Sequence, residues 1–167
     1  MQFPLDAETR ALESPGDHRE ELRLWLRMLA CSSVIETDIR RRLRRQFGVT
    51  LPRFDLMAQL ERAPGGMTLS EISKRMMVSN GNLTALVERL VQSGRLARTP
   101  SPRDGRAQLI SLTRLGRRAF KVMAAQHSVW IADLFAGLPR RDIADLSKLL
   151  AVAKASAQTS IARREPN

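Results

Sequence analysis

The chain has 167 residues, 43% of them hydrophobic, which is enough to bury one ordinary core in a single domain. Lys and Arg total 28 against 17 Asp and Glu, and this net charge of +11 predicts a polyanionic partner: nucleic acid or, less often, an anionic membrane. The single cysteine excludes an internal disulfide framework and a cysteine-based zinc site, and it fits a reducing cytoplasm. We expect neither a signal peptide nor a membrane span, because Arg23 and Arg27 interrupt the richest apolar stretch.

The first third of the chain is predicted to be an arm followed by two helices. Residues 1–17 contain two prolines and a glycine and are interpreted as a flexible arm. Helical periodicity then runs over residues 18–47 and is expected to stop at Gly48. A short helix with Pro52 in its first turn follows, and Pro64-Gly65-Gly66 ends it.

Two further short helices are predicted close together in the sequence. Thr68 precedes Glu71 by three residues, which is the spacing of a capping box at a helix start. Ser79 is the expected N-cap of the next helix, and Gly94 its stop. Two helices joined by a few residues, the second opening with small polar side chains, are typical of a helix–turn–helix.

The remaining sequence predicts a hairpin and two long helices. "RLART" and "RAQLISLT" are interpreted as strands, joined by "PSPRDG", in which Asp104-Gly105 is a strong tight-turn signal. Helical periodicity returns from about Arg114 to Phe135, and Pro139 begins a last helix. One face of that helix is apolar and carries Ile143, Leu146, Leu150, Ala153 and Ala157. The fold class is therefore mainly α with a small β-hairpin wing.

This arrangement suits double-stranded DNA, because the start of the second short helix can enter the major groove and present polar groups to base edges. A cationic hairpin tip suits a narrow minor groove, where Asp104 could orient a guanidinium. The alternatives are a generic helical hairpin with polar caps and a solvated hairpin whose charges guard an edge strand. The candidate DNA-binding residues are Lys74, Arg75, Ser79, Asn80, Asn82, Thr84, Ala85, Arg89, Arg98, Arg103, Asp104 and Arg106.

The stretches "GVTLPRFDLMAQL", "MTLSEISKRMMVSNGNLTALVERLVQSGRLART" and "SPRDGRAQLISLTRLG" resemble the MarR family of winged-helix transcription regulators. The resemblance covers about residues 20–160. It implies a winged helix–turn–helix homodimer whose first and last helices interleave, a roughly palindromic operator and, often, release by a small molecule. It also implies a recognition helix over residues 79–93 and a wing over 95–112. Arg106 would be the minor-groove arginine, steadied by Asp104.

The resemblance also implies how the single domain is divided by role. Residues 1–17 would be the arm, residues 18–47 and 114–162 the helical dimerisation region, and residues 48–113 the DNA-binding region. Gly105 stands where many family members have another arginine, so the wing tip is expected to be less cationic than usual.

An effector pocket is expected where the family places it, between the first helix, the second helix and the helix after the wing. Plain core packing is the alternative for each lining candidate: Trp25, Met28, Leu29, Ser32, Phe54, Met57 and His127. In the run "IRRRLRRQ", Arg40 and Arg44 could hold the phosphates of a bulky anionic ligand, or the run could be a solvated face or support DNA-backbone contacts. "RMMVSNGN" is similar to the MarR branch that responds to aryl-CoA thioesters.

The sequence favours regulation over other functions. Cys31 is interpreted as a small buried residue rather than a redox sensor, and the two histidines are too far apart in sequence to predict a metal site. No nucleophile–base pair or phosphate-binding glycine loop stands out, so we expect neither catalysis nor a cofactor. The leading hypothesis is a cytoplasmic, nucleoid-associated repressor of aromatic-compound catabolism, released by an aromatic acid or aryl-CoA thioester. The alternative is a ligand-independent architectural or RNA-binding winged-helix protein.

Overall fold

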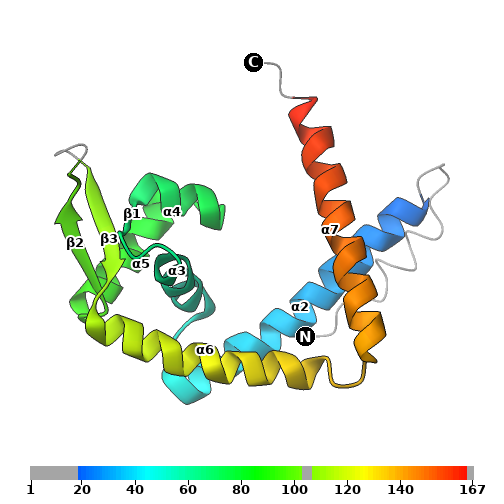
Figure 1. The fold of residues 1–167 in the computed structure, drawn as a ribbon, viewed down its shortest axis with the longest axis horizontal. Coiled ribbons are helices and arrows are strands. Elements are labelled where there is room, and N and C mark those ends of the chain that lie inside the picture. Colours follow the sequence, from blue (N-terminus) through cyan, green and yellow to red (C-terminus); the bar gives the residue numbers. More distant parts are fainter. Residues whose placement is uncertain (1–18, 103–106, 165–167) are drawn as a thin grey trace. The chain divides into compact units, whose positions relative to one another are not determined.

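The computed structural model describes residues 19–102 and 107–164, except for the side chain of Asn80. The chain forms two compact units, the first ending at His127 and the second beginning at Ser128. Figure 1 shows the elements in chain order. The predicted arm over residues 1–17 and the candidates Arg103, Asp104 and Arg106 lie outside the described residues.

The first two helices are α2 (Arg19–Phe47) and α3 (Leu51–Glu61), in agreement with the periodicity of the sequence. Gly48 ends α2 as predicted: it has a φ of +63° and its N–H donates to the Arg44 carbonyl at 3.1 Å. The buried residues of α2, Ile39 and Leu43, lie in its C-terminal half, where the helix packs against α3.

The helix–turn–helix consists of α4 (Leu69–Met76) and α5 (Asn80–Gln92), which pack against each other. The predicted capping box is confirmed. The Glu71 N–H donates to Thr68 Oγ1 at 3.3 Å, and the Thr68 N–H donates to Glu71 Oε2 at 2.8 Å. Ser79 occupies the N-cap position of α5, as the sequence predicts.

The wing has one more strand than the sequence predicts. Strands β2 (Leu96–Pro100) and β3 (Gln108–Leu112) form the expected antiparallel hairpin, and β1 (Met67–Thr68) pairs with the other edge of β3, giving the order β1-β3-β2. Met67 lies opposite Ile110, and Leu96 lies opposite Leu112. The predicted hairpin of β2 and β3 is confirmed. The sequence does not predict β1, because a two-residue strand shows no alternation that a pattern could reveal.

Aliphatic side chains and methionine fill most of the core of the first unit, consistent with an aromatic content of 4%. They come from the end of α2, from α3, α4 and α5, and from the strands, which Figure 1 shows beside α4 and α5. The most deeply buried side chains are Leu43, Val49, Leu56, Met57, Leu60, Ile72, Leu83, Val87 and Leu90. This core holds the helix–turn–helix against the wing.

Helix α6 (Arg114–Leu134) begins at a closely fitted junction with the wing. Thr113 Oγ1 donates to the Gly94 carbonyl at 2.7 Å and accepts from the Gly116 N–H at 3.0 Å. A Cβ atom built on Gly116 would lie 2.0 Å from the carbonyl oxygen of Arg95, so a side chain there must displace backbone. The "LTRLG" sequence therefore fixes where α6 leaves the wing.

The second unit contains the end of α6 and α7 (Arg140–Ala162), with Pro139 at the N-cap position as predicted. Helix α7 has no buried residue. Its exposed large apolar side chains are Ile143, Leu146, Leu149, Leu150, Val152 and Ile161. Across residues 19–102 and 107–164, no helix is both long and apolar enough to span a membrane.

Candidate nucleic-acid interface

One side of α5 belongs to the core and the other side is free for a partner. Leu83, Val87 and Leu90 are buried against the first unit. Asn82, Ala85 and Arg89 recur at i, i+3 and i+7, which places them in one row along the helix, and each is exposed. We call this row the reading face. It presents an amide, a methyl group and a guanidinium, which are groups that can contact base edges, thymine methyls and phosphates.

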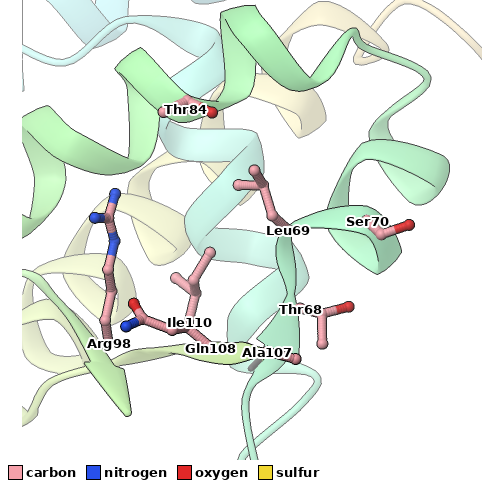
Figure 2. A pocket seen from close by; sticks show the side chains of 8 residues that line it. All are labelled: Thr68, Leu69, Ser70, Thr84, Arg98, Ala107, Gln108 and Ile110. Atoms are coloured by element: carbon pink, nitrogen blue, oxygen red, sulfur yellow. The ribbon is translucent and has the colours of Figure 1, made fainter. Parts of the chain in front are cut away.

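A groove separates α5 from the wing and the start of α4. It has a volume of about 410 Å³, and its walls come from α5, from both strands of the hairpin and from β1 with the first turn of α4. Figure 2 shows the Arg98 side chain extending from β2 towards α5, which carries Thr84. The lining residues are Thr68, Leu69, Ser70, Thr84, Arg98, Ala107, Gln108 and Ile110. Thr84 therefore faces this groove rather than sharing the row of Asn82.

Arg98 makes an ion pair that the sequence analysis did not predict. Its Nη2 atom lies 2.9 Å from Oε2 of Glu88, and 34% of its side chain is exposed. The pair joins β2 to α5 across the flank of the groove. Half-exposed ion pairs contribute little stability, about 0–1 kcal/mol, so its main effect is to orient the arginine. Glu88 was missed because ten residues separate the partners and no helical or strand spacing relates them.

The remaining DNA candidates surround α5. Lys74 and Arg75 are exposed on the last turn of α4, and Ser79 is exposed at the start of α5. The backbone of Asn80 forms the first residue of α5. Strand pairing reaches Pro100 and Gln108, and beyond it the Ser101 N–H donates to the Ala107 carbonyl at 2.8 Å. The wing is therefore hydrogen-bonded up to the segment that holds Arg103, Asp104 and Arg106.

The candidate effector residues fall into two groups: those on α3 and α6, and those on α2. Phe54 and Met57 are buried in the core, and His127 is half-buried, with its ring centroid 4.8 Å from that of Phe54. Burial lowers the pKa of His127 below its ordinary value. On α2, Met28 is half-buried. The exposed candidates on α2 are Trp25, Leu29, Ser32, Arg40 and Arg44.

Cys31 is exposed, contrary to our prediction that it is a small buried residue. The prediction assumed that the first helix packs along its whole length. In the structure the buried residues of α2 are confined to its C-terminal half, and within residues 19–102 and 107–164 no side chain covers Cys31 enough to bury it. A helical pattern indicates which residues share a face, but it does not say whether the same chain covers that face.

The carboxyl group of Asp55 has a raised pKa. Burial, helped by the nearby Glu36, raises its pKa from 3.8 to about 6, while Arg40 acts in the opposite direction. Arg40 itself pairs with Glu36 at 2.7 Å. Asp55 lies on α3 in a surface groove of about 360 Å³, together with Ala58, Gln59, Arg62 and Met76.

Replacing Asp55 by asparagine is expected to stabilise the protein above pH 6. The folded chain binds the proton of Asp55 more tightly than the unfolded chain, so the contribution of this group to stability falls as the pH rises from 3.8 to about 6. Asparagine removes the charge, and we expect a gain of about 1 kcal/mol after solvent screening. Urea unfolding of wild type and Asp55→Asn at about pH 8 and about pH 4 checks this. If the difference in unfolding free energy between the two proteins is the same at both pH values, the prediction is wrong.

The buried core, the exposed reading face and the attached wing define a winged helix–turn–helix protein of the DNA-binding class. A sequence model described as MarR family matches residues 47–107. The transcriptional activatory protein BadR of Rhodopseudomonas palustris is 30% identical over 118 residues, which is 68% of this chain and 67% of BadR. The transcriptional repressor MdtR of Bacillus subtilis is 29% identical over 112 residues, covering 67% of this chain and 72% of MdtR.

A solved structure supports the same assignment. A MarR family transcriptional regulator from Silicibacter pomeroyi matches with a TM-score of 0.74 and 29% identity, covering 86% of this chain and 99% of that one. The chain belongs to the MarR family and is a DNA-binding transcriptional regulator. The predicted fold class, mainly α with a winged helix–turn–helix, is confirmed.

Proposed function

We propose that this chain acts as a homodimer that binds a palindromic operator as a repressor and is released by a small aromatic effector. The observation that carries the proposal is the contrast between two exposed helices. Helix α5 presents the polar reading face, whereas α7 has no buried residue and exposes a row of large apolar side chains. Apolar patches of this kind mark protein–protein interfaces.

The partner that we propose for α7 is a second copy of this chain. Ile143, Leu146 and Leu150 alternate at three- and four-residue spacing, which suits packing against another helix. The N-terminal half of α2 also exposes apolar side chains, including Trp25 and Leu29. A two-fold dimer would cover both surfaces and present two recognition helices to successive major grooves, about 34 Å apart.

The proposed effector is an aromatic acid or an aryl-CoA thioester, and the proposed target is an operon for aromatic-compound catabolism. Two features of α2 support this chemistry. Trp25 and Leu29 offer apolar side chains for an aryl group, on the surface that the proposed dimer would also cover. Arg40 and Arg44, both exposed on the C-terminal half of the helix, can hold phosphates through charge-assisted hydrogen bonds.

Three measurements test the proposal. Sedimentation equilibrium should give twice the mass of a single chain. Titration of the DNA upstream of its own gene, with competitor DNA present, should show tight binding that one aromatic acid or CoA thioester abolishes. Binding that is weak and indifferent to sequence and ligand would favour an architectural role instead. A promoter–reporter assay then separates repression from the activation implied by the name of BadR.

Replacing Asn82 by alanine should change sequence preference more than general affinity. Asn82 is exposed on the reading face, and an amide can make paired hydrogen bonds to adenine. We expect operator affinity to fall about tenfold while competitor affinity changes little. The matched control is Gln92→Ala, an exposed amide at the far end of the same helix. Equal losses on operator and competitor would show that Asn82 does not read a base.

A further inference from the structure

Met77 stands at the corner of the helix–turn–helix in a backbone conformation that methionine rarely adopts. It is the residue after α4, with φ 54° and ψ 39°, and the residue is 93% exposed. Within residues 19–102 and 107–164, it is the only non-glycine residue with a positive φ. A left-handed residue with a long side chain is strained, and glycine or asparagine is the usual occupant of such a position.

The surrounding turn holds this strain in place through Ser73. The Met77 N–H donates to the Ser73 carbonyl, and so does the Val78 N–H, at 3.3 Å. The Ser73 hydroxyl donates in turn to the Val78 carbonyl at 2.6 Å. These bonds fix the corner from both sides, so the apolar side chain of Met77 is held away from the core.

Met77 lies between the candidate DNA-binding residues of α4 and those of α5. It lies two residues before Ser79, the N-cap of the recognition helix α5. Lys74 and Arg75, on the last turn of α4, are both exposed. The exposed Met77 therefore follows these two cations within three residues of the chain, and exposed cations suit a polyanionic partner. The apolar surface that such a partner offers consists of thymine methyl groups and deoxyribose carbons.

We propose that Met77 is a DNA-contacting residue whose thioether side chain packs on a thymine methyl or a deoxyribose at the edge of the major groove. This inference rests on the DNA-binding role of the helix–turn–helix. It explains why a strained and almost fully exposed methionine occupies a position for which glycine would give a more stable fold. The side chain serves the complex rather than the free protein.

The test compares three substitutions in the full-length protein. Met77→Gly should raise Tm, because it relieves the left-handed strain, and should lower operator affinity about tenfold, because it removes the contact. Met77→Asn, which also tolerates this conformation, should lose affinity similarly. Met77→Leu keeps an apolar side chain and should retain most of the affinity. Unchanged operator affinity in Met77→Gly and Met77→Asn would overturn the proposal, whatever their Tm.

A second arm identifies the contacted atoms. Each thymine of the operator is replaced in turn by uracil, which lacks the 5-methyl group, and binding is measured for wild type and Met77→Gly. A position that weakens wild type but not the variant identifies a methyl contact. Loss of affinity in Met77→Gly with no such position assigns the contact to deoxyribose. If the wild-type protein does not bind the operator specifically, both the proposed function and the Met77 proposal are wrong. If the wild type binds specifically and Met77→Gly binds equally well, only the Met77 proposal is wrong.

Discussion

Replacing Gly116 by alanine is expected to lower Tm by about 10 °C, the largest stability effect that we predict for a single methyl group. The added Cβ would lie 2.0 Å from the Arg95 carbonyl oxygen, far inside van der Waals contact. The obstructing atom is backbone, so no side chain can rotate away. Either the wing or the start of α6 must move, and the move would strain the hydrogen bonds of Thr113 to Gly94 and Gly116.

The matched control is Gly81→Ala. Gly81 also lies near the start of a helix, α5, but a Cβ there would have no atom within 4 Å. Alanine should therefore stabilise the helix by about 0.5–1 kcal/mol, because it restricts the unfolded chain. Thermal melts followed by circular dichroism measure both variants. A Gly116→Ala protein with the same Tm as the wild type would contradict the close approach of Arg95 and Gly116.

The helix boundaries could be predicted because their signals are local. Thr68 and Glu71 form a capping box from residues three apart, and Gly48 ends α2 through its own backbone conformation. Proline at position 139 likewise marks the start of α7. In each case the physical cause lies within one turn of the residue that signals it, so the local sequence is enough to predict the helix boundary.

The errors arose where the cause lies elsewhere in the chain or outside it. β1 exists because Met67 pairs with Ile110, more than forty residues away in the numbering. The ion pair of Glu88 with Arg98 depends on how α5 meets β2. Cys31 is exposed because it lies in the part of α2 that has no buried residue. Periodicity identifies an apolar face but not what will cover it.

The candidate DNA site was also predictable only where its signals are local. The spacing of Asn82, Ala85 and Arg89 places them on one row of a helix, and the structure shows all three exposed. The sequence did not show that Thr84 turns instead towards the groove beside the wing. Whether any of these residues touches DNA stays a prediction, and the substitutions proposed above test it.

Replacing Arg106 by alanine is expected to weaken operator binding about tenfold to a hundredfold with little change in Tm. Arg106 lies outside the described residues. In the sequence it follows the Asp104-Gly105 turn signal, between the residues of two paired strands. An arginine there can enter a narrow minor groove, whose negative potential attracts it. Gel-shift or anisotropy titrations at several salt concentrations measure the effect.

The matched control is Arg141→Ala, which removes the same charge from an exposed site on α7. If Arg106 acts only through the net charge of the protein, both variants should lose the same small affinity, because long-range charge effects are screened within about 10 Å at 0.1 M salt. If it enters the groove, only Arg106→Ala should weaken binding strongly and reduce the salt dependence by about one phosphate contact. Equal affinities for the two variants would remove the wing from operator recognition and leave it to α5 alone.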